Sequence, residues 1–251
     1  MPAEKATAIV LRKVDFSESS LVVSLFTREF GKIDGLAKGA KRLKGPFESA
    51  LDLLAVCRIV FLRKTSETLD LLTEAKLERR FRVTGPGLEG LYAGYYVAEM
   101  LSEMTDRYDP HPELFDLADD TLAGLAAGDD VSKRLLRFEL GALRELGHLP
   151  ALECCAECGK PIAISGRITF GLLDGGALCP RCRQGKRQVA SVAAGVLRIM
   201  AQFAAPGDRW RRIEIDRRSH GELRGLLNHF VCHLLGRKPR LHEFLGRLDA
   251  N

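Results

Sequence analysis

Apolar and polar residues alternate with a period of two over much of the first third of the chain. The alternation is clearest over residues 21–26 and 51–62, and shorter versions of it cover residues 7–14, 32–37 and 69–76. Side chains of a half-buried strand point alternately to the core and to solvent, so the pattern predicts five strands. Five strands within about 75 residues, with no helical pattern between the early ones, favour a small Greek-key barrel such as an OB-fold.

The spacing of apolar residues then changes to that of helices. A Gly-Pro-Gly sequence at residues 85–87 marks the change, because glycine and proline interrupt regular structure. Apolar positions three and four residues apart predict helices over residues 88–104, from Pro112 onward, and over residues 130–146. A mainly α-helical part should therefore follow the strands.

Two more helices are expected towards the end of the chain. Ser191 is expected to cap the first, and Ser219–Glu222 has the pattern of a capping box that opens the second. The whole pattern predicts an α+β fold, with an OB-fold domain over residues 1–80 and a helical domain over residues 81–251.

Four cysteines are arranged as two Cys-x-x-Cys pairs, Cys155 with Cys158 and Cys179 with Cys182. Four thiolates at this spacing can enclose a Zn²⁺ ion in a tetrahedron. Short apolar runs between the pairs predict a zinc ribbon, inserted in the helical domain over about residues 152–186. One structural zinc per chain is expected, because four thiolates leave no coordination position for water.

Other interpretations of the four cysteines require conditions that the sequence does not offer. Disulfides require an oxidising compartment, and no export signal is expected at the start of this chain. A redox-active site needs one pair rather than two. The neighbouring Cys154 is a spare thiol that could take the place of Cys155.

The net charge of +5 is unevenly distributed along the chain. Residues 1–80 carry +4, residues 81–150 carry −7 and residues 151–251 carry +8. The last value falls by about two if four thiolates hold one Zn²⁺ ion. Two basic stretches favour a polyanion such as nucleic acid as partner, whereas the acidic middle fits an ordinary solvated helix face equally well.

The sequence contains no apolar run of membrane-spanning length. We therefore expect a cytoplasmic protein with no membrane contact, whose seven cysteines stay reduced or bind metal. Cys57 lies on the apolar side of its predicted strand, which predicts a buried thiol.

A cationic loop, residues 38–47, follows the third predicted strand and is bounded by glycine and proline. Such a loop beside a barrel can contact successive phosphates, and its Phe47 could stack on a base. A merely solvated loop is the alternative. The candidate phosphate contacts are Lys38, Lys41, Arg42 and Lys44 in the loop, with Arg12, Lys13, Arg28 and Lys32 as extensions.

Two further groups of residues leave their role open. Arginines surround the single Trp210 and could contact phosphate or simply be solvated. His229 and His233, with Cys232 beside them, have helical spacing for a metal site, but no carboxylate completes a hydrolase motif. The arginines are Arg209, Arg211, Arg212, Arg217 and Arg218.

The order of these features resembles the RecO family of bacterial recombination mediators. The likeness covers nearly the whole chain and is carried by Ala8–Leu11, Leu25–Lys32, Ala37–Arg42 and the cysteine pairs with Gly175–Gly176 before the second. After the first strand the family commonly has Gly-Glu where this chain has Ser17-Glu18, which leaves the geometry of that turn open. Some members lack the cysteines, so the resemblance implies that zinc is structural.

The resemblance implies a protein that binds single- and double-stranded DNA and anneals complementary strands. It also implies contact with the C-terminal tail of single-strand-binding protein. With RecR, and possibly RecF, such a protein would help to load RecA onto coated DNA during repair. It implies a nucleoid-associated location in the bacterial cytoplasm and no enzymatic activity.

Three other functions remain as alternatives. A zinc-ribbon protein that binds RNA or acts in transcription would also combine a barrel with a ribbon. A metal-dependent enzyme would use Cys154 or the His229, Cys232 and His233 group, although no phosphate-binding loop or His-Glu-x-x-His motif is present. A pure adaptor would bind a partner through its apolar helices.

Overall fold

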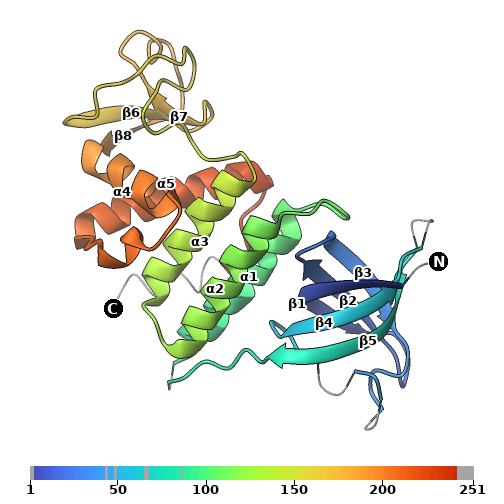
Figure 1. The fold of residues 1–251 in the computed structure, drawn as a ribbon. Coiled ribbons are helices and arrows are strands. Elements are labelled where there is room, and N and C mark those ends of the chain that lie inside the picture. Colours follow the sequence, from blue (N-terminus) through green and yellow to red (C-terminus); the bar gives the residue numbers. More distant parts are fainter. Residues whose placement is uncertain (1–2, 43–44, 48–49, 65–67, 86, 242–251) are drawn as a thin grey trace. The chain divides into compact units, whose positions relative to one another are not determined.

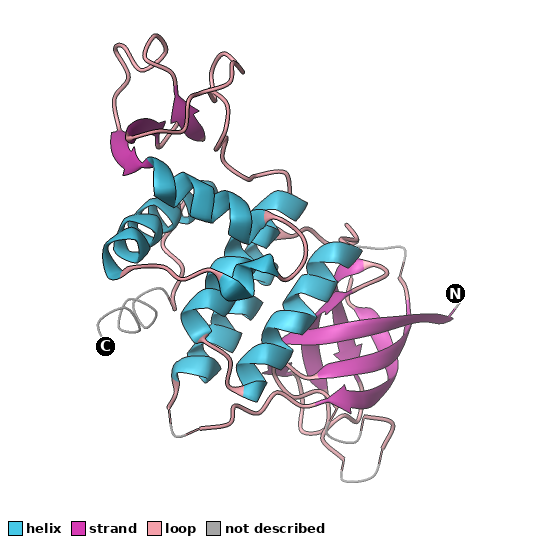
Figure 2. Ribbon diagram, turned by 60° about the vertical axis from the view of Figure 1, so that its left-hand side comes forward, coloured by secondary structure: helices cyan, strands magenta, loops and turns pink. Residues whose placement is uncertain are grey.

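The computed structural model describes residues 3–42, 45–47, 50–64, 68–85 and 87–241. Strands come first, helices follow, and a small sheet separates the third helix from the fourth, so the mixed α+β character is as predicted (Figures 1 and 2). The chain divides into two compact units, with the division between Leu135 and Leu136. Within the described ranges, every helix is too short or too polar to cross a membrane.

The N-terminal sheet contains the five predicted strands. They pair in the order β1-β2-β3-β5-β4, and β4 also pairs with β1, so the strands close into a barrel (Figure 1). Neighbours are antiparallel except for β3 and β5, which share a short parallel pairing. The strands are β1 (Ala3–Asp15), β2 (Leu21–Thr27), β3 (Gly31–Ala37), β4 (Val56–Leu62) and β5 (Asp70–Arg79).

Alternate residues of the strands fill the interior of this barrel. Val23, Leu25, Ile33 and Phe61 are fully buried there, as the period-two pattern requires. Withdrawing these apolar side chains from water is the main stabilising contribution to the sheet. Cys57 lies among them, and burial raises the pKa of its thiol to about 12, which confirms the prediction of a buried thiol.

The prediction of a strand from residue 51 is wrong at its beginning, because β4 starts only at Val56. The preceding residues form a turn in which Leu54 adopts a φ of +63°. The amide of Leu54 donates to the carbonyl of Val10 at 2.8 Å, and the amide of Val10 donates to the carbonyl of Ala55 at 3.0 Å. Leu51 belongs to the barrel core and Leu54 is buried, whereas Leu53 is exposed, so this segment has the apolar pattern of a strand without being one.

Helices α1 (Glu89–Met104) and α2 (Pro112–Ala127) belong to the same unit and contact each other. They also contact the outside of the sheet, α1 on β1 and α2 on β2. The ring centroids of Phe115 in α2 and Phe26 in β2 are 6.1 Å apart, and both side chains are buried. Both helices lie where the apolar spacing predicted them. Because they pack on β1 and β2, that side of the barrel is shielded from solvent.

Helix α3 (Val131–Glu145) runs from the end of the first unit into the second. The helix ends as predicted near Gly147, whose φ of +73° suits a glycine at this position. The rest of the second unit is a three-stranded sheet in the order β7-β6-β8, followed by helices. Its elements are β6 (Arg167–Gly171), β7 (Gly176–Leu178), β8 (Val189–Ala193), α4 (Ala194–Ala204), the short helix η1 (Arg209–Arg212) and α5 (Arg217–Leu235).

Two predicted helix caps in the second unit are wrong. Ser191 lies within β8, where its carbonyl and hydroxyl oxygens accept hydrogen bonds from Arg167, and α4 begins after it without a side-chain cap. Helix α5 is capped by Asp216, whose carboxylate accepts hydrogen bonds from the next turn, rather than by Ser219. Glu222, the other half of the expected capping box, instead accepts hydrogen bonds from Arg167 and from the amide of Ala193, so tertiary contacts replace the local ones.

Charged side chains of α3 are buried inside the second unit. Arg137 donates to the carbonyls of Phe203 and Ala204 at the end of α4, which satisfies groups that the helix leaves unpaired. Glu139, fully buried, pairs with Arg224 of α5 through both of its carboxylate oxygens. These contacts fix α3, α4 and α5 to one another.

Candidate metal centre and nucleic-acid interface

The sulfur atoms of Cys155, Cys158, Cys179 and Cys182 lie within 4.8 Å of one another. The Sγ atoms of Cys158 and Cys179, which come from different pairs, are 4.0 Å apart. Among the residues that the structure describes, these four form the only cluster of three or more potential metal ligands. The predicted set of four is therefore brought together, and Cys154 stands outside it.

Backbone amides turn toward the sulfur atoms at this site. The amide of Cys179 donates to Sγ of Cys155, and the amide of Cys182 donates to Sγ of Cys179, both at 3.4 Å. Burial raises the pKa of the Cys155 thiol, but hydrogen bonds from backbone amides outweigh this effect and lower it to about 6. Amide donors also lower the pKa of Cys179. These two shifts favour the thiolate, which is the form that binds a metal ion, whereas the side-chain hydrogen bond with Cys179 raises the pKa of the Cys182 thiol to about 12.

The arrangement fits a closed, tetrahedral metal site. Gly159, with a φ of +69°, allows the chain to turn just after the first pair, and its amide donates to the carbonyl of Cys155 at 2.9 Å. Four sulfur ligands suit zinc or iron, and they leave no position open for a substrate or a water molecule. Such a site stabilises a fold and has no free position for chemistry.

An ion-pair network holds the loops of the ribbon around these cysteines. The ammonium group of Lys186 lies between the carboxylates of Glu157, at 2.9 Å, and Asp174. Hydrogen bonds to Asp174 and Glu157 raise the pKa of this amine. Lys186 therefore connects the turn that follows Cys182 to the turn between Cys155 and Cys158 and to the turn between β6 and β7. Counting charges along the sequence did not reveal this contact.

The cationic loop begins directly after β3 in the first unit. Lys38 and Arg42 are exposed, and neither has a hydrogen bond or ion pair from its side chain among the described residues. Lys41 is held by the opposite turn, with its ammonium group 2.9 Å from Asp15 and its amide 3.1 Å from the carbonyl of Ser19. Lys44, the fourth predicted contact, lies outside the described residues.

A glycine shapes this loop around Arg42. Gly39 has a φ of +75°, and its carbonyl accepts a hydrogen bond from the amide of Arg42 at 3.1 Å. A Cβ atom at this position would lie 3.6 Å from Cδ and Nε of Arg42, so the arginine stem crosses directly over the glycine. The loop therefore presents the guanidinium group from a fixed turn.

The prediction that Phe47 stacks on a base is wrong. Its side chain is only 3% exposed and belongs to the core of the barrel. The preceding Pro46 accepts a hydrogen bond from the amide of Ala75 in β5 at 3.0 Å, which holds this part of the chain against the sheet. A buried ring anchors the end of the loop and cannot meet a nucleobase.

Arg12 and Lys13 are exposed near the end of β1. Arg12 lies opposite Ser24 and Lys13 opposite Val23 of β2. Consecutive residues of a strand point to opposite faces, so the two side chains do not share one surface. The ammonium group of Lys13 also forms an ion pair with Asp52 at 2.9 Å.

Lys32 is engaged inside the first unit. Its ammonium group donates to the carbonyls of Ser102, at 2.6 Å, and Thr105, which lie at the end of α1. A cation at the C-terminal end of a helix is favoured by unpaired carbonyls and by the helix dipole. The neighbouring Gly31 has a φ of +68°, and a Cβ atom there would lie 2.1 Å from the carbonyl oxygen of Asp109. The chain after α1 thus crosses β3 in close contact.

Arg28 also has a partner within the first unit. Its guanidinium group forms a two-point contact with the carboxylate of Asp116 in α2, at 2.8 and 3.0 Å. The hydrogen bond to Asp116 raises the pKa of Arg28. Both side chains are about half exposed, so the pair stays accessible to solvent.

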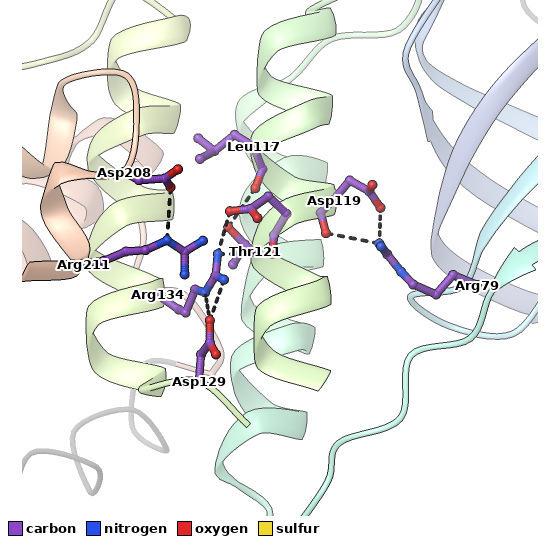
Figure 3. Close-up of polar contacts among 9 residues, drawn as sticks. Arg79, Leu117, Asp119, Thr121, Asp129, Arg134, Asp208 and Arg211 are labelled. Carbon is purple, nitrogen blue, oxygen red and sulfur yellow. Dashed lines mark hydrogen bonds and ion pairs between the residues drawn. The ribbon is translucent and has the colours of Figure 1, made fainter. Parts of the chain in front are cut away.

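Other arginines of the first unit join its helices and sheet (Figure 3). Arg79, at the end of β5, donates to the backbone carbonyl and to the carboxylate of Asp119 in α2. Arg134, almost fully buried, contacts the carboxylates of Asp120 and Asp129. Part of the acidic charge of residues 81–150 is thus neutralised locally.

The second group of arginines, in the second unit, is exposed around a buried Trp210. Arg211 contacts Asp208 at 3.1 Å (Figure 3), and its guanidinium carbon lies 4.7 Å from the centroid of the tryptophan ring. His229 and His233 are exposed and belong to no metal-ligand cluster within the described part of the chain. The metal interpretation of that helix therefore gains no support.

Comparisons with known proteins identify the family. Residues 1–81 match the family "Recombination protein O N terminal" and residues 86–242 match "Recombination protein O C terminal". The chain is 42% identical to the DNA repair protein RecO of Rhodopirellula baltica, over 97% of this chain and 99% of that protein. It is 34% identical to the RecO protein of Anaeromyxobacter dehalogenans, over 99% and 98%, and 32% identical to that of Myxococcus xanthus, over 97% of each. The chain therefore belongs to the RecO family of DNA repair proteins.

Proposed function

We propose that this chain is a DNA-binding recombination mediator that anneals complementary strands. With RecR, it would help to load RecA onto single-stranded DNA that is coated by single-strand-binding protein. One observation carries the proposal: at the end of β3, Lys38 and Arg42 are exposed on a loop whose backbone is held to the neighbouring turn through Lys41. The proposed DNA-binding domain is the barrel of residues 1–80, an OB-type fold.

The physical requirement of annealing fits such a loop. Two strands can pair only if the repulsion between their phosphates is screened while their base edges stay free. Lysine and arginine side chains contact phosphate oxygens without reading sequence, and the release of counterions drives that binding. Lys38 and Arg42, together with Lys41 and Lys44, supply these contacts in our proposal. Arg12 and Lys13 extend them on either side of β1, and Arg28 and Lys32 contribute positive charge from positions where acids or carbonyls already hold them.

We further propose that the metal is zinc, one ion per chain, with a structural role. The support is the donor set, since four thiolates from two knuckles are typical of structural zinc. A catalytic metal ion would need a free coordination position for water or substrate, and this site has none. The proposed function includes no catalysis. The remaining proposed partners are duplex DNA, the C-terminal tail of single-strand-binding protein, RecF and, indirectly, RecA, in the nucleoid of a bacterial cytoplasm.

Replacement of Lys38, Lys41, Arg42 and Lys44 by alanine should weaken binding to single-stranded oligonucleotides and slow annealing. Each phosphate contact that is lost should lower the slope of log K against log salt by about 0.7 for a single strand. Fluorescence anisotropy over a salt series, together with an annealing assay using labelled complementary strands, measures both effects.

The matched control replaces Lys76 and Arg80, two exposed cations of the same unit, by alanine. This control should keep most of the affinity. A quadruple variant with unchanged affinity and unchanged salt slope would remove the loop from the interface. Tighter binding of structured RNA than of DNA, without annealing, would instead favour the RNA-binding alternative.

A further inference from the structure

Phe16 is an exposed aromatic residue in a hydrogen-bonded turn. It lies between β1 and β2, and 63% of its surface is accessible to solvent. The turn is closed by hydrogen bonds from the amides of Phe16 and Ser17 to the carbonyl of Ser20, at 3.1 and 3.3 Å, and from the amide of Ser20 to the hydroxyl of Ser17, at 3.2 Å. The ring is thus held outward by a defined backbone, although its burial would be favourable.

Strand pairing places this ring beside the cationic loop. Asp15 lies opposite Leu21, and Leu21 lies opposite Ala37, so one row crosses β1, β2 and β3. Phe16 and Lys38 each follow this row by one residue. Since neighbouring strands are about 4.8 Å apart, their backbones are separated by about 10 Å. The side chains of the two residues can therefore reach one ligand.

The cationic loop is also attached directly to the turn that carries Phe16. The amide of Lys41 donates to the carbonyl of Ser19, and its ammonium group contacts the carbonyl of Ser17 at 3.2 Å and the carboxylate of Asp15 at 2.9 Å. Through these contacts the ammonium group of Lys41 joins the cationic loop to the turn between β1 and β2. Lys38 and Arg42 remain exposed on either side of it.

We propose that Phe16 is a stacking platform for one unpaired nucleobase of single-stranded DNA, with the adjacent phosphates on Lys38 and Arg42. An aromatic face beside cationic side chains is the combination with which proteins bind single strands. Bases in a duplex are covered by their neighbours, so this site selects single-stranded over double-stranded DNA. The inference rests on the proposed DNA-binding function and adds the chemical group that the site recognises.

Stacking at Phe16 also fits the annealing reaction. A ring that contacts the face of a base leaves its hydrogen-bonding edge free. The held base can therefore meet a complementary strand before it leaves the protein. Phosphate contacts alone would hold the strand without presenting any base.

The test compares Phe16→Ala, Phe16→Leu and Phe16→Trp with the unaltered chain, using a single-stranded oligonucleotide and the matching duplex at one salt concentration. Loss of one stacked base costs about 1–3 kcal/mol, so Phe16→Ala should weaken single-strand binding about 5- to 150-fold. Duplex affinity should change less than about twofold, and the salt slope should stay constant because no phosphate contact is lost. Phe16→Trp should restore binding, and its fluorescence should be quenched by the single strand.

Leu88→Ala, which removes another exposed apolar side chain of the same unit, is the control and should leave both affinities unchanged. If Phe16→Leu binds single strands as tightly as the unaltered chain, the contact is apolar rather than stacked and the proposal falls. Equal losses for single strand and duplex would also overturn it. If Phe16→Ala binds normally while the lysine and arginine variants of the loop lose affinity, the base site is wrong and the proposed function stands. Normal binding by all of these variants would overturn both.

Discussion

Replacement of Cys182 by alanine should abolish stoichiometric metal binding and unfold the ribbon around β6, β7 and β8. The three strands are short, and their buried apolar residues are too few to maintain a sheet of this size alone. In small zinc domains the metal supplies an apparent free energy on the order of 10–16 kcal/mol at neutral pH. We expect one metal ion per chain in the unaltered protein and none in the variant, by elemental analysis, with new protease cleavage within residues 152–186.

The neighbouring thiol offers a matched control for this experiment. Cys154 precedes the first pair but stands outside the cluster of four sulfur atoms. Cys154→Ala should therefore bind the same amount of metal and resist protease as the unaltered chain does. Full metal content in Cys182→Ala, or loss of metal in Cys154→Ala, would show that the ligand set is wrong. The same elemental analysis distinguishes zinc from iron.

Replacement of Glu139 by alanine should destabilise the second unit by about 3–5 kcal/mol, because it leaves the guanidinium group of Arg224 buried without its carboxylate. Glu139 is fully buried and Arg224 is only 7% exposed. The carboxylate receives two hydrogen bonds from Arg224, which also donates to the neutral side-chain amide oxygen of Asn228. Denaturant unfolding followed by circular dichroism measures the change as a lower midpoint with a similar slope.

A double-mutant cycle separates the pair from its surroundings. Glu139→Leu combined with Arg224→Met removes both charges, and it should cost less than either single change, because neither charge is then left buried without the other. The pair of Arg58 and Glu78 on the barrel is the exposed comparison, with 75% and 32% of the side chains accessible. Arg58→Ala should change stability by less than about 1 kcal/mol. A loss of similar size at both sites would contradict a special role for the buried pair.

The local sequence pattern was sufficient to predict an element wherever that pattern is compatible with only one local structure. The alternation of residues 21–26 and 32–37 fixed strands because one face of each is buried in the barrel. The helices α1 and α2 followed from apolar spacing in the same way. Two Cys-x-x-Cys pairs predicted a cluster of four sulfur atoms, since their ligand geometry is encoded in a short spacing.

The errors arose where tertiary contacts decide between two local possibilities. Leu54 and Phe47 are buried although they lie outside the strands, Leu54 beside Gly94 of α1 and Phe47 in the barrel core. A period-two pattern cannot distinguish such residues from those of a strand or from an exposed ring. Ser219 has the residue type of a cap, but Asp216 lies earlier and accepts the amides of the first turn. The position of Lys32 also depends on tertiary structure, because only the fold shows that the end of α1 lies within its reach.

The first helices cover the barrel so closely that the barrel should not behave as a separable piece. A fragment that ends near residue 81 would expose Phe26, which is fully buried in the intact chain, once Phe115 is gone. It would also lose Tyr108, whose hydroxyl donates to the buried Asp70 of β5. Truncation studies that seek the smallest stable portion containing the barrel should therefore retain the sequence through α2, even though the strands themselves end at Arg79.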